Sequence, residues 1–417
     1  MLLFLAACTN ANTTPPEAAP PADSESANVT LVLWQSWSGT DSQVISPLVN
    51  EYNNQNPQGR VLVQAISMST LDDEFRTQAT RGSGPHMIMM PSSWVGELAS
   101  ADLFLPLDEF ISPAERNTLL PVTLGSGQIR NTEGKTTLYG LPISFDTLAL
   151  FYNQANIETA PEDTDDLLRL ARGLSDPDDE PPRWGWAMDL SIDETIGYLH
   201  AFGGQVFDEN GEVVLANAGS DGAEQWLEWL MALNDDPQLF VRLDSSIQVE
   251  RHVKNNQVVM SFGWAHELAA YRQLWGGQMG IAPLPVLSET NQAPQPYVQS
   301  TLLAVNQGIS ETERNAAMAF LRYMISEEVQ EVLLEHEIQP ARQDLRLSGD
   351  EPHLIAARIF RAQAEQSQPI LNGRERDLIW RELQLMQRQA VTKSINPADA
   401  VLNADQRLRD QLESDNP

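Results

Sequence analysis

Residues 138–153 read LYGLPISFDTLALFYN, and this stretch decides the fold. Pro142 precedes an apolar run that a single acidic residue, Asp146, interrupts. The apolar residues on both sides predict a loop that enters a buried strand. A carboxylate inside such a strand must find a partner, because burying it unpaired is unfavourable. We therefore expect Asp146 to be paired with another side chain or to contact a ligand.

The chain before this stretch alternates between short apolar runs and amphipathic segments. The expected elements are strand, helix, strand, helix and strand, at residues 29–34, 42–52, 60–66, 71–80 and 87–90. Pro47 falls inside the first helix, so a kink or a later start is expected. This alternation predicts an α/β layer, in which ligands bind beyond the carboxyl ends of strands. The residues at those ends are Trp37, Ser67, Ser93 and Trp94.

The rest of the chain predicts a hairpin and several helices. Residues 205–215 read as a β-hairpin with Asn210 and Gly211 in its turn. Residues 222–234 predict a helix that carries Trp226 and Trp229 on its apolar face, which favours a core position for both. The remaining expected helices are 311–325, capped by Ser310, followed by 374–391 and 397–412.

Length and charge exclude several classes of protein. The 417 residues are too many for one hydrophobic core, so two or more lobes are expected. The chain carries 26 basic and 58 acidic residues, a net charge of −32. Such a surface repels nucleic acid and anionic lipid, which excludes nucleic acid as the main partner. We interpret the acidity as a source of solubility.

The N-terminus predicts a lipid anchor. Cys8 is the only cysteine and follows Leu5, Ala6 and Ala7, a pattern that looks like a bacterial lipobox. Residues 9–28 are rich in Thr, Pro, Ala and acidic residues and predict a disordered tether. No basic residue precedes Cys8, so either translation starts upstream or the sequence is trimmed. The alternative is an unmodified, buried cysteine.

Motifs for catalysis or for metal binding are missing from the sequence. It contains no phosphate-binding loop, no His-Glu-x-x-His and no Cys-x-x-Cys, and its six histidines are scattered. The acidic segment 176–180 lacks EF-hand spacing and is interpreted as a solvated loop. We therefore expect no cofactor, no metal and no enzymatic activity.

Residues 138–153 strongly resemble the inter-lobe crossing of family 1 extracellular solute-binding proteins, the maltose-binding type of ABC importers. Other segments agree in order: GSGP at 82–85, LFLPLD at 103–108, AFGG at 201–204 and VVMSFGW at 258–264. The resemblance covers about residues 29–412. It implies the two-lobe periplasmic-binding-protein fold of type II, with three inter-lobe crossings and a ligand cleft between the lobes. Residues 29–144 plus 302–342 would form one lobe, and 148–300 plus 344–412 the other.

The expected ligand-binding residues come from strand ends and from this resemblance. Trp37 and Trp94 offer flat apolar faces for a sugar ring at strand ends, or alternatively pack under loops. Trp264 and Asp146 match a ligand-facing tryptophan and a hydroxyl-binding carboxylate of the family, although Asp146 could also form a hinge salt bridge. The full set is Trp37, Ser92, Ser93, Trp94, Asp146, Glu194, Trp264, Trp380 and Arg342.

The resemblance implies a monomeric, lipid-anchored, extracytoplasmic receptor that captures a sugar and delivers it to the permease subunits of an ABC transporter. Two alternatives remain at this point. A receptor for glycerol phosphate or another anion would use Arg342, which could instead be a structural ion-pair partner. A surface glycoside hydrolase would need two carboxylates about 5 to 10 Å apart, and only Asp146 and Glu194 could serve.

Overall fold

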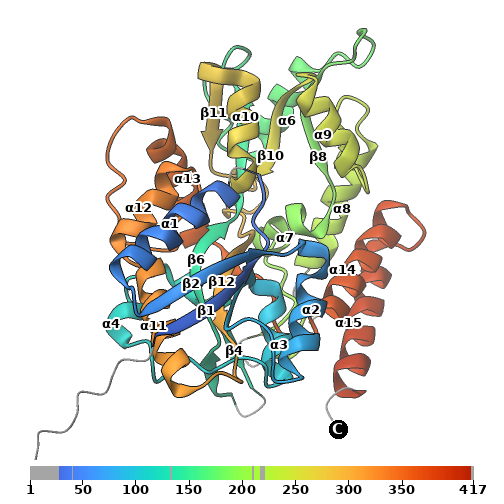
Figure 1. Ribbon diagram of the computed structural model, residues 1–417. Coiled ribbons are helices and arrows are strands. Elements are labelled where there is room, and N and C mark those ends of the chain that lie inside the picture. The colour runs from blue at the N-terminus through green and yellow to red at the C-terminus, as the bar shows by residue number, and fades with distance from the viewer. Residues whose placement is uncertain (1–27, 40, 132–133, 209–210, 217–220, 415–417) are drawn as a thin grey trace, which may run out of the picture.

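The computed structural model describes residues 28–39, 41–131, 134–208, 211–216 and 221–414. Cys8 and all but the last residue of the expected tether lie outside the described residues, as does Asn210. The described chain forms two lobes, each with a sheet at its centre (Figure 1).

The first sheet occupies the lower lobe in Figure 1. Its strand order is β13-β12-β3-β1-β2, and β6 pairs with β12 as well. The strands are β1 (Val29–Gln35), β2 (Gly59–Ala65), β3 (Met87–Pro91), β6 (Gly140–Asp146), β12 (Tyr297–Val305) and β13 (Gln368–Pro369). Strand β1 pairs in parallel with β2 and β3, so these three strands bring their carboxyl ends to one edge.

The second sheet lies in the upper lobe and has the order β11-β7-β10-β8-β9 (Figure 1). Its strands are β7 (Leu148–Asn153), β8 (Trp184–Asp189), β9 (Phe240–Arg242), β10 (Val258–Trp264) and β11 (Met279–Ala282). Strand β10 pairs antiparallel with β7 and parallel with β8. A two-stranded ribbon of β4 (Gln128–Arg130) and β5 (Thr136–Leu138) lies outside both main sheets.

Helices cover the sheets on both sides. Those of the N-terminal half are α1 (Ser42–Gln55), α2 (Met68–Ala79), α3 (Val95–Ser100), α4 (Pro113–Arg116), α5 (Pro121–Ser126), α6 (Thr164–Leu174) and α7 (Ile192–Ala201). Those that follow are α8 (Gly222–Asp235), α9 (Ser246–Lys254), α10 (Leu268–Trp275), α11 (Glu311–Met324), α12 (Glu327–Glu335), α13 (Pro352–Glu365), α14 (Arg376–Val391) and α15 (Pro397–Ser414). Short 3₁₀ turns are η1 (Ser92–Trp94), η2 (Ala265–Glu267) and η3 (Gly276–Gln278).

The chain passes between the two sheets three times. The first passage is at Thr147, between β6 and β7, and the second lies between β11 and β12. The third lies between α12 and α13, because α12 packs in the first-sheet core while Phe360 of α13 packs beside Phe151 of β7. These three crossings, all of them before α13, agree with the sequence-based expectation, and the short strand β13 then pairs with β12 of the first sheet. The lobe limits given above remain a prediction.

Alternation along β1 explains how the first sheet buries both of its faces. Leu31 and Leu33 join the cluster that contains Tyr52 of α1 and Phe320 of α11. Trp34, one position on, joins a separate cluster with Phe75 of α2. Successive side chains of a strand point to opposite faces, so one short apolar run serves two layers of helices.

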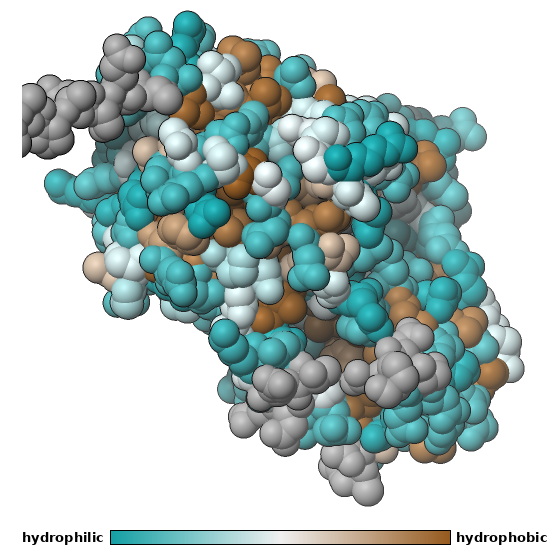
Figure 2. Space-filling view, turned by 60° about the horizontal axis from the view of Figure 1, so that its bottom comes forward, coloured by the Kyte–Doolittle hydropathy of each residue, from teal (hydrophilic) through white to brown (hydrophobic). Residues whose placement is uncertain are grey.

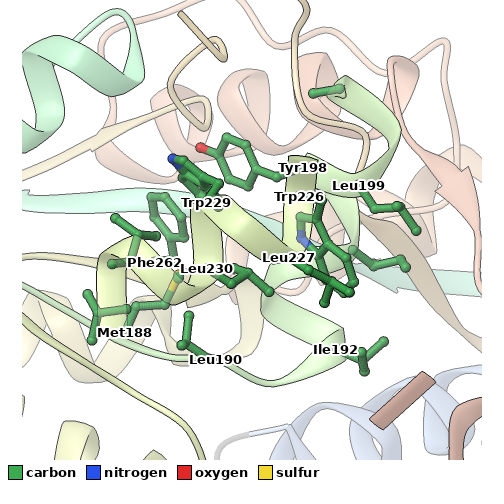
Figure 3. Close-up of a cluster of buried hydrophobic side chains, with 14 of the residues drawn as sticks. Met188, Leu190, Ile192, Tyr198, Leu199, Trp226, Leu227, Trp229, Leu230 and Phe262 are labelled. Carbon is green, nitrogen blue, oxygen red and sulfur yellow. The ribbon is translucent and has the colours of Figure 1, made fainter. Parts of the chain in front are cut away.

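The core of the second lobe is built around α8. Trp226 and Trp229 are buried there with Leu227 and Leu230 of the same helix, and Tyr198 and Phe262 lie close to them (Figure 3). Trp226 donates its indole N–H to the backbone oxygen of Thr195 at 3.1 Å, which satisfies the one polar atom of that side chain. The C-terminal helices α14 and α15 lie side by side and close this core from outside (Figure 1).

The expected helices and strands of the first lobe are present with ends shifted by a few residues. Pro47 lies inside α1, which begins at Ser42, so the later start is not found. Ser310 caps α11 as expected: its hydroxyl accepts from the backbone N–H of Glu313, whose carboxylate in turn accepts from the Ser310 N–H.

The described residues of the predicted hairpin at 205–215 pair as two antiparallel arms, although they form no regular strand. Phe207 and Val213 form an antiparallel bridge. The Val214 N–H donates to the Val206 carbonyl and the Asp208 N–H to the Glu212 carbonyl, both at 3.0 Å. The apolar side chains of this segment, those of Val206, Val213 and Leu215, are buried in the second-lobe core.

The surface is consistent with an acidic, water-exposed protein. Figure 2 shows a face covered largely by hydrophilic residues, with hydrophobic ones in small groups among them. Among the described residues, no helix is both long enough and apolar enough to cross a membrane.

Candidate functional site

A cavity of about 340 Å³ lies where the chain crosses between the sheets. Parallel strands β1, β2 and β3 direct their carboxyl ends to this edge, and Trp37, Met68 and Pro91 line the cavity there. The crossing segments supply the opposite wall. The other lining residues are Ser36, Ser38, Asp41, Ser144, Phe145, Asp146, Ala265, His266, Leu268, Ala269, Gln299, Ser300, Thr301, His336, Glu337, Ile338 and Gln339.

Asp146 and His266 form the polar centre of this cavity. The His266 Nδ1 lies 2.5 Å from Asp146 Oδ2, across 120 residues of sequence. The second carboxylate oxygen, Oδ1, is buried and has no hydrogen-bond partner among the described residues. The hydrogen bond and charge of Asp146 raise the pKa of His266 to about 9, so His266 is protonated at neutral pH.

A second cavity of about 840 Å³ adjoins the first, and His266 lines both. It lies against α9, the end of β10 and α10. The lining residues are Glu194, Ser246, Ile247, Val249, Glu250, Val253, Lys254, Ser261, Phe262, Trp264, His266, Glu267, Ala270, Tyr271, Gln273 and Leu274. This lining combines aromatic rings with carboxylates, the groups that suit a sugar ring and its hydroxyls.

Two carboxyl groups of the second cavity, those of Glu194 and Glu267, are shielded from water by burial. Burial raises the pKa of Glu194 well above its ordinary value, and the nearby carboxylates of Asp189 and Glu267 act in the same direction. Burial also raises the pKa of Glu267, although the Trp264 backbone N–H donates to its carboxylate at 2.8 Å. Burial therefore favours the protonated form of both carboxyl groups, and in that form each can donate to a ligand hydroxyl as well as accept from one.

The structure brings four of the predicted site residues to these cavities. Trp37 and Asp146 line the first, and Glu194 and Trp264 line the second. Both tryptophans are half-buried, so each has part of its ring open.

The other residues proposed from strand ends line neither cavity. Ser92 is fully buried, and its hydroxyl accepts a hydrogen bond from the Ser300 backbone N–H at 3.1 Å. Ser93 and Trp94 lie in the 3₁₀ turn after β3, where Trp94 packs against the first-sheet cluster around Phe75. The contacts of Trp94 indicate packing, which is the alternative interpretation considered for it.

Trp380 and Arg342 also lie away from both cavities. Trp380 is buried, donates to Asp193 at 3.4 Å and has the Arg376 guanidinium 4.8 Å from its ring centroid. Arg342 donates to the Ile325 carbonyl at 3.0 Å and forms an ion pair with Asp344 at 2.6 Å. These contacts indicate that Arg342 is a structural ion-pair partner.

His266 is the candidate site residue that sequence reasoning missed. It sits two positions after Trp264 and carries no motif of its own, so only the hydrogen bond to Asp146 reveals it. A second ion pair beside it, from Arg272 of α10 to Glu337 of the third crossing, was missed for the same reason. The sequence places the carboxylate of Asp146 inside a buried strand, and this position indicated that Asp146 must have a partner such as His266.

These features define a class of protein: a two-lobe α/β binding protein with its ligand cavity at the crossings between two sheets. A family model described as bacterial extracellular solute-binding protein matches residues 47–352, most of the chain. The chain belongs to this family, which is one of binding proteins rather than enzymes. The family that the sequence resembles, and the expected absence of catalysis, are thereby confirmed.

Two relatives extend the similarity. The maltotriose-binding protein of Pyrococcus abyssi (strain GE5 / Orsay) is 23% identical over 306 residues, which cover 72% of this chain and 63% of that protein. The maltodextrin-binding protein MdxE of Bacillus subtilis (strain 168) is 22% identical over 257 residues, which cover 57% of this chain and 55% of that protein. The aligned region thus spans less than two thirds of the length of either relative.

Solved structures show the same fold over nearly the whole chain. A cyclo/maltodextrin-binding protein complexed with maltotetraose has a TM-score of 0.78 at 19% identity, covering 94% of this chain and 99% of that one. The maltose/maltodextrin-binding domain MalE from Bdellovibrio bacteriovorus, bound to maltotriose, has a TM-score of 0.73 at 21% identity, covering 92% and 100%. The predicted two-lobe periplasmic-binding-protein fold is therefore confirmed.

Proposed function

We propose that this protein is the extracytoplasmic substrate-binding component of an ABC importer and that it captures a maltodextrin-type oligosaccharide. The observation that carries this proposal is the cavity at the crossings, which combines the half-exposed ring of Trp37 with the charged acceptor Asp146. The names of the similar proteins, which bind maltotriose, maltodextrins or maltotetraose, support the choice of ligand.

The proposed mechanism is capture by lobe closure. Trp37 belongs to the first lobe, while Trp264 lies on the second and Asp146 at the first crossing. A saccharide that touches all three makes its full set of contacts only when the lobes are together, so it shifts the population toward the closed form. The closed form would then dock on the permease subunits and release the sugar without any covalent step.

The two alternatives from the sequence are less well supported. Among the described residues that line the two cavities, none is an arginine. Their cations, Lys254 and His266, are paired with Glu250 and Asp146, and Arg342 is engaged with Asp344. A receptor for glycerol phosphate would need a cation that is not already paired with a carboxylate. A glycoside hydrolase would need Asp146 and Glu194 around one bond, but they line different cavities and Asp146 is held by His266.

The proposal is tested with a ligand panel on residues 28–417. We expect maltose, maltotriose and maltotetraose to raise the melting temperature and to be recovered intact after incubation, because a ligand that binds only the folded state stabilises it. Glycerol phosphate serves as the anionic comparison. If only glycerol phosphate raised the melting temperature, the sugar proposal would be refuted. If the saccharide were recovered cleaved, the protein would be a glycoside hydrolase instead.

We propose further that the protein is held at the outer side of a membrane by a lipid on Cys8. The support is the sequence alone: small residues before a single cysteine, followed by a polar, proline-rich segment. Mass spectrometry of the full chain expressed in a bacterial host is expected to find a lipid on Cys8 at the mature N-terminus. The Cys8→Ser variant is expected to carry no lipid and to be recovered in the soluble fraction. An unmodified cysteine in the mature wild-type protein would contradict the anchor.

A further inference from the structure

His266 occupies the boundary between the two cavities. It is the only residue common to both linings as described, and its side chain is 61% exposed. The backbone just before it is held by two hydrogen bonds. The Ala265 N–H donates to the Thr147 carbonyl at 3.1 Å, and the Trp264 N–H donates to Glu267 Oε2 at 2.8 Å. The imidazole can therefore change position by rotating its side chain, without a change in the chain around it.

The contact with Asp146 occupies the carboxylate oxygen that a ligand can reach. Asp146 Oδ1 is shielded from solvent, whereas the Asp146 side chain as a whole remains 27% exposed. The accessible oxygen is Oδ2, and this is the oxygen that His266 holds at 2.5 Å. A saccharide hydroxyl that donates to Asp146 must therefore displace the imidazole or compete with it.

The charges around His266 hold it in this place. Glu267 of its own turn and Asp41 at the start of α1 both favour its protonated form, as Asp146 does. The other charged groups of the two linings have neighbours of their own. Glu337 binds Arg272, Lys254 binds Glu250, and the His336 ring bonds the Val332 carbonyl. Glu194 has Asp189, Glu267 and Asp193 as its charged neighbours.

We propose that His266 is a gate that determines the length of saccharide the site accepts, because its rotation away from Asp146 joins the two cavities into one groove. This inference rests on the proposed saccharide-binding function. A short saccharide fits within one cavity and leaves the His266–Asp146 pair in place. A longer one spans both cavities, displaces His266 and takes over the accessible oxygen of Asp146.

The first test compares maltose with maltotetraose on the wild type and on His266→Ala. We expect maltotetraose to bind roughly fivefold more tightly to His266→Ala than to the wild type, about the net worth of one exposed charge-assisted contact. Maltose affinity should change less than maltotetraose affinity, because maltose does not compete with the imidazole for Asp146. The matched control is His353→Ala in α13, a histidine that lines neither cavity and should alter neither affinity.

The second test is the pH dependence of the same affinities. His266 has a pKa of about 9 while it is paired with Asp146, and displacement by a ligand returns this pKa toward its ordinary value of 6.5. Binding of maltotetraose therefore releases a proton between these two values, so its affinity should rise as the pH increases from about 6.5 to about 9. Maltose binding, and both ligands on His266→Ala, should show no such rise.

Three outcomes would overturn the gate. Weaker or unchanged maltotetraose binding by His266→Ala would show that His266 does not compete for Asp146. A free wild-type protein whose His266 imidazole titrates near 6.5 by NMR would show that the pair does not form in solution, whatever the ligand. A wild type that binds neither saccharide, yet shows the raised His266 pKa, would instead contradict the proposed function on which the gate depends.

Discussion

Replacing Trp226 by alanine should destabilise the second lobe by roughly 3–5 kcal/mol, the largest loss that any single substitution discussed for this protein should cause. The side chain is fully buried in the core around α8 (Figure 3). Its removal leaves a cavity among Leu227, Leu230 and their neighbours and leaves the Thr195 carbonyl without its donor. The measurement is urea unfolding followed by far-UV circular dichroism.

The matched control is Trp184→Ala. Trp184 belongs to the same lobe and contacts the aromatic ring of Phe240, but it is only half-buried at the start of β8. A partly exposed side chain loses less on truncation, so the loss of unfolding free energy should be clearly smaller. Equal losses for the two variants would show that the core is not centred on Trp226.

Replacing Trp264 by alanine should weaken maltotetraose binding by roughly 1–3 kcal/mol, the scale of a lost aromatic contact with a ligand. Trp264 ends β10 and lines the second cavity with part of its ring open. The measurement is isothermal titration calorimetry at constant pH. The expected loss appears in the affinity, whereas the melting temperature of the free protein should change little because the ring is only partly packed.

Trp184→Ala is the comparison here as well, because it removes a half-buried tryptophan of the same lobe that lines neither cavity. Its affinity for maltotetraose should equal that of the wild type. Unchanged affinity in a correctly folded Trp264→Ala would remove this residue from the binding site. A loss of affinity in both variants would point to a general effect on the lobe instead.

The alternation of strands and helices was predictable because the spacing of apolar residues along the chain differs between strands and helices. The run at 29–34 and the helix that follows it bury residues at spacings that the sequence displays directly, as Leu31, Leu33 and Ile45 show. The packing role of Trp226 followed from the same kind of pattern. The turn signal at Gly211 predicted that the two arms of segment 205–215 pair, as the bridge between Phe207 and Val213 shows, but it does not show that Val206 and Leu215 pack into the second-lobe core.

The site was predictable only where a residue lies at a strand end or at the crossing. Trp37 and Asp146 were found in that way, and both line the first cavity. Ser92 follows a strand too, but the hydroxyl turns inward to accept from Ser300, and sequence does not show which way a side chain turns. His266 was missed because its significance comes from Asp146, 120 residues away, and a single sequence carries no record of that contact.

Asp146 illustrates how a local rule can predict a distant feature. An acidic residue inside an apolar strand requires a partner. The structure supplies one through Oδ2 and leaves Oδ1 without one among the described residues. A half-satisfied carboxylate at a crossing between lobes is a costly arrangement for stability. The role in binding proposed for Asp146 rests on Oδ2, the oxygen that a ligand can reach.

The central claim is that a maltodextrin-type saccharide binds intact between the lobes, and a crystal structure of the protein with maltotetraose tests it most directly. The account predicts unbroken saccharide density that runs from Trp37 past Asp146 to Trp264, with a sugar hydroxyl within hydrogen-bond distance of Asp146 Oδ2 and the His266 ring turned away. Saccharide density outside the two cavities or a cleaved saccharide would contradict this account. So would a maltotetraose that spans both cavities while His266 still contacts Asp146 Oδ2.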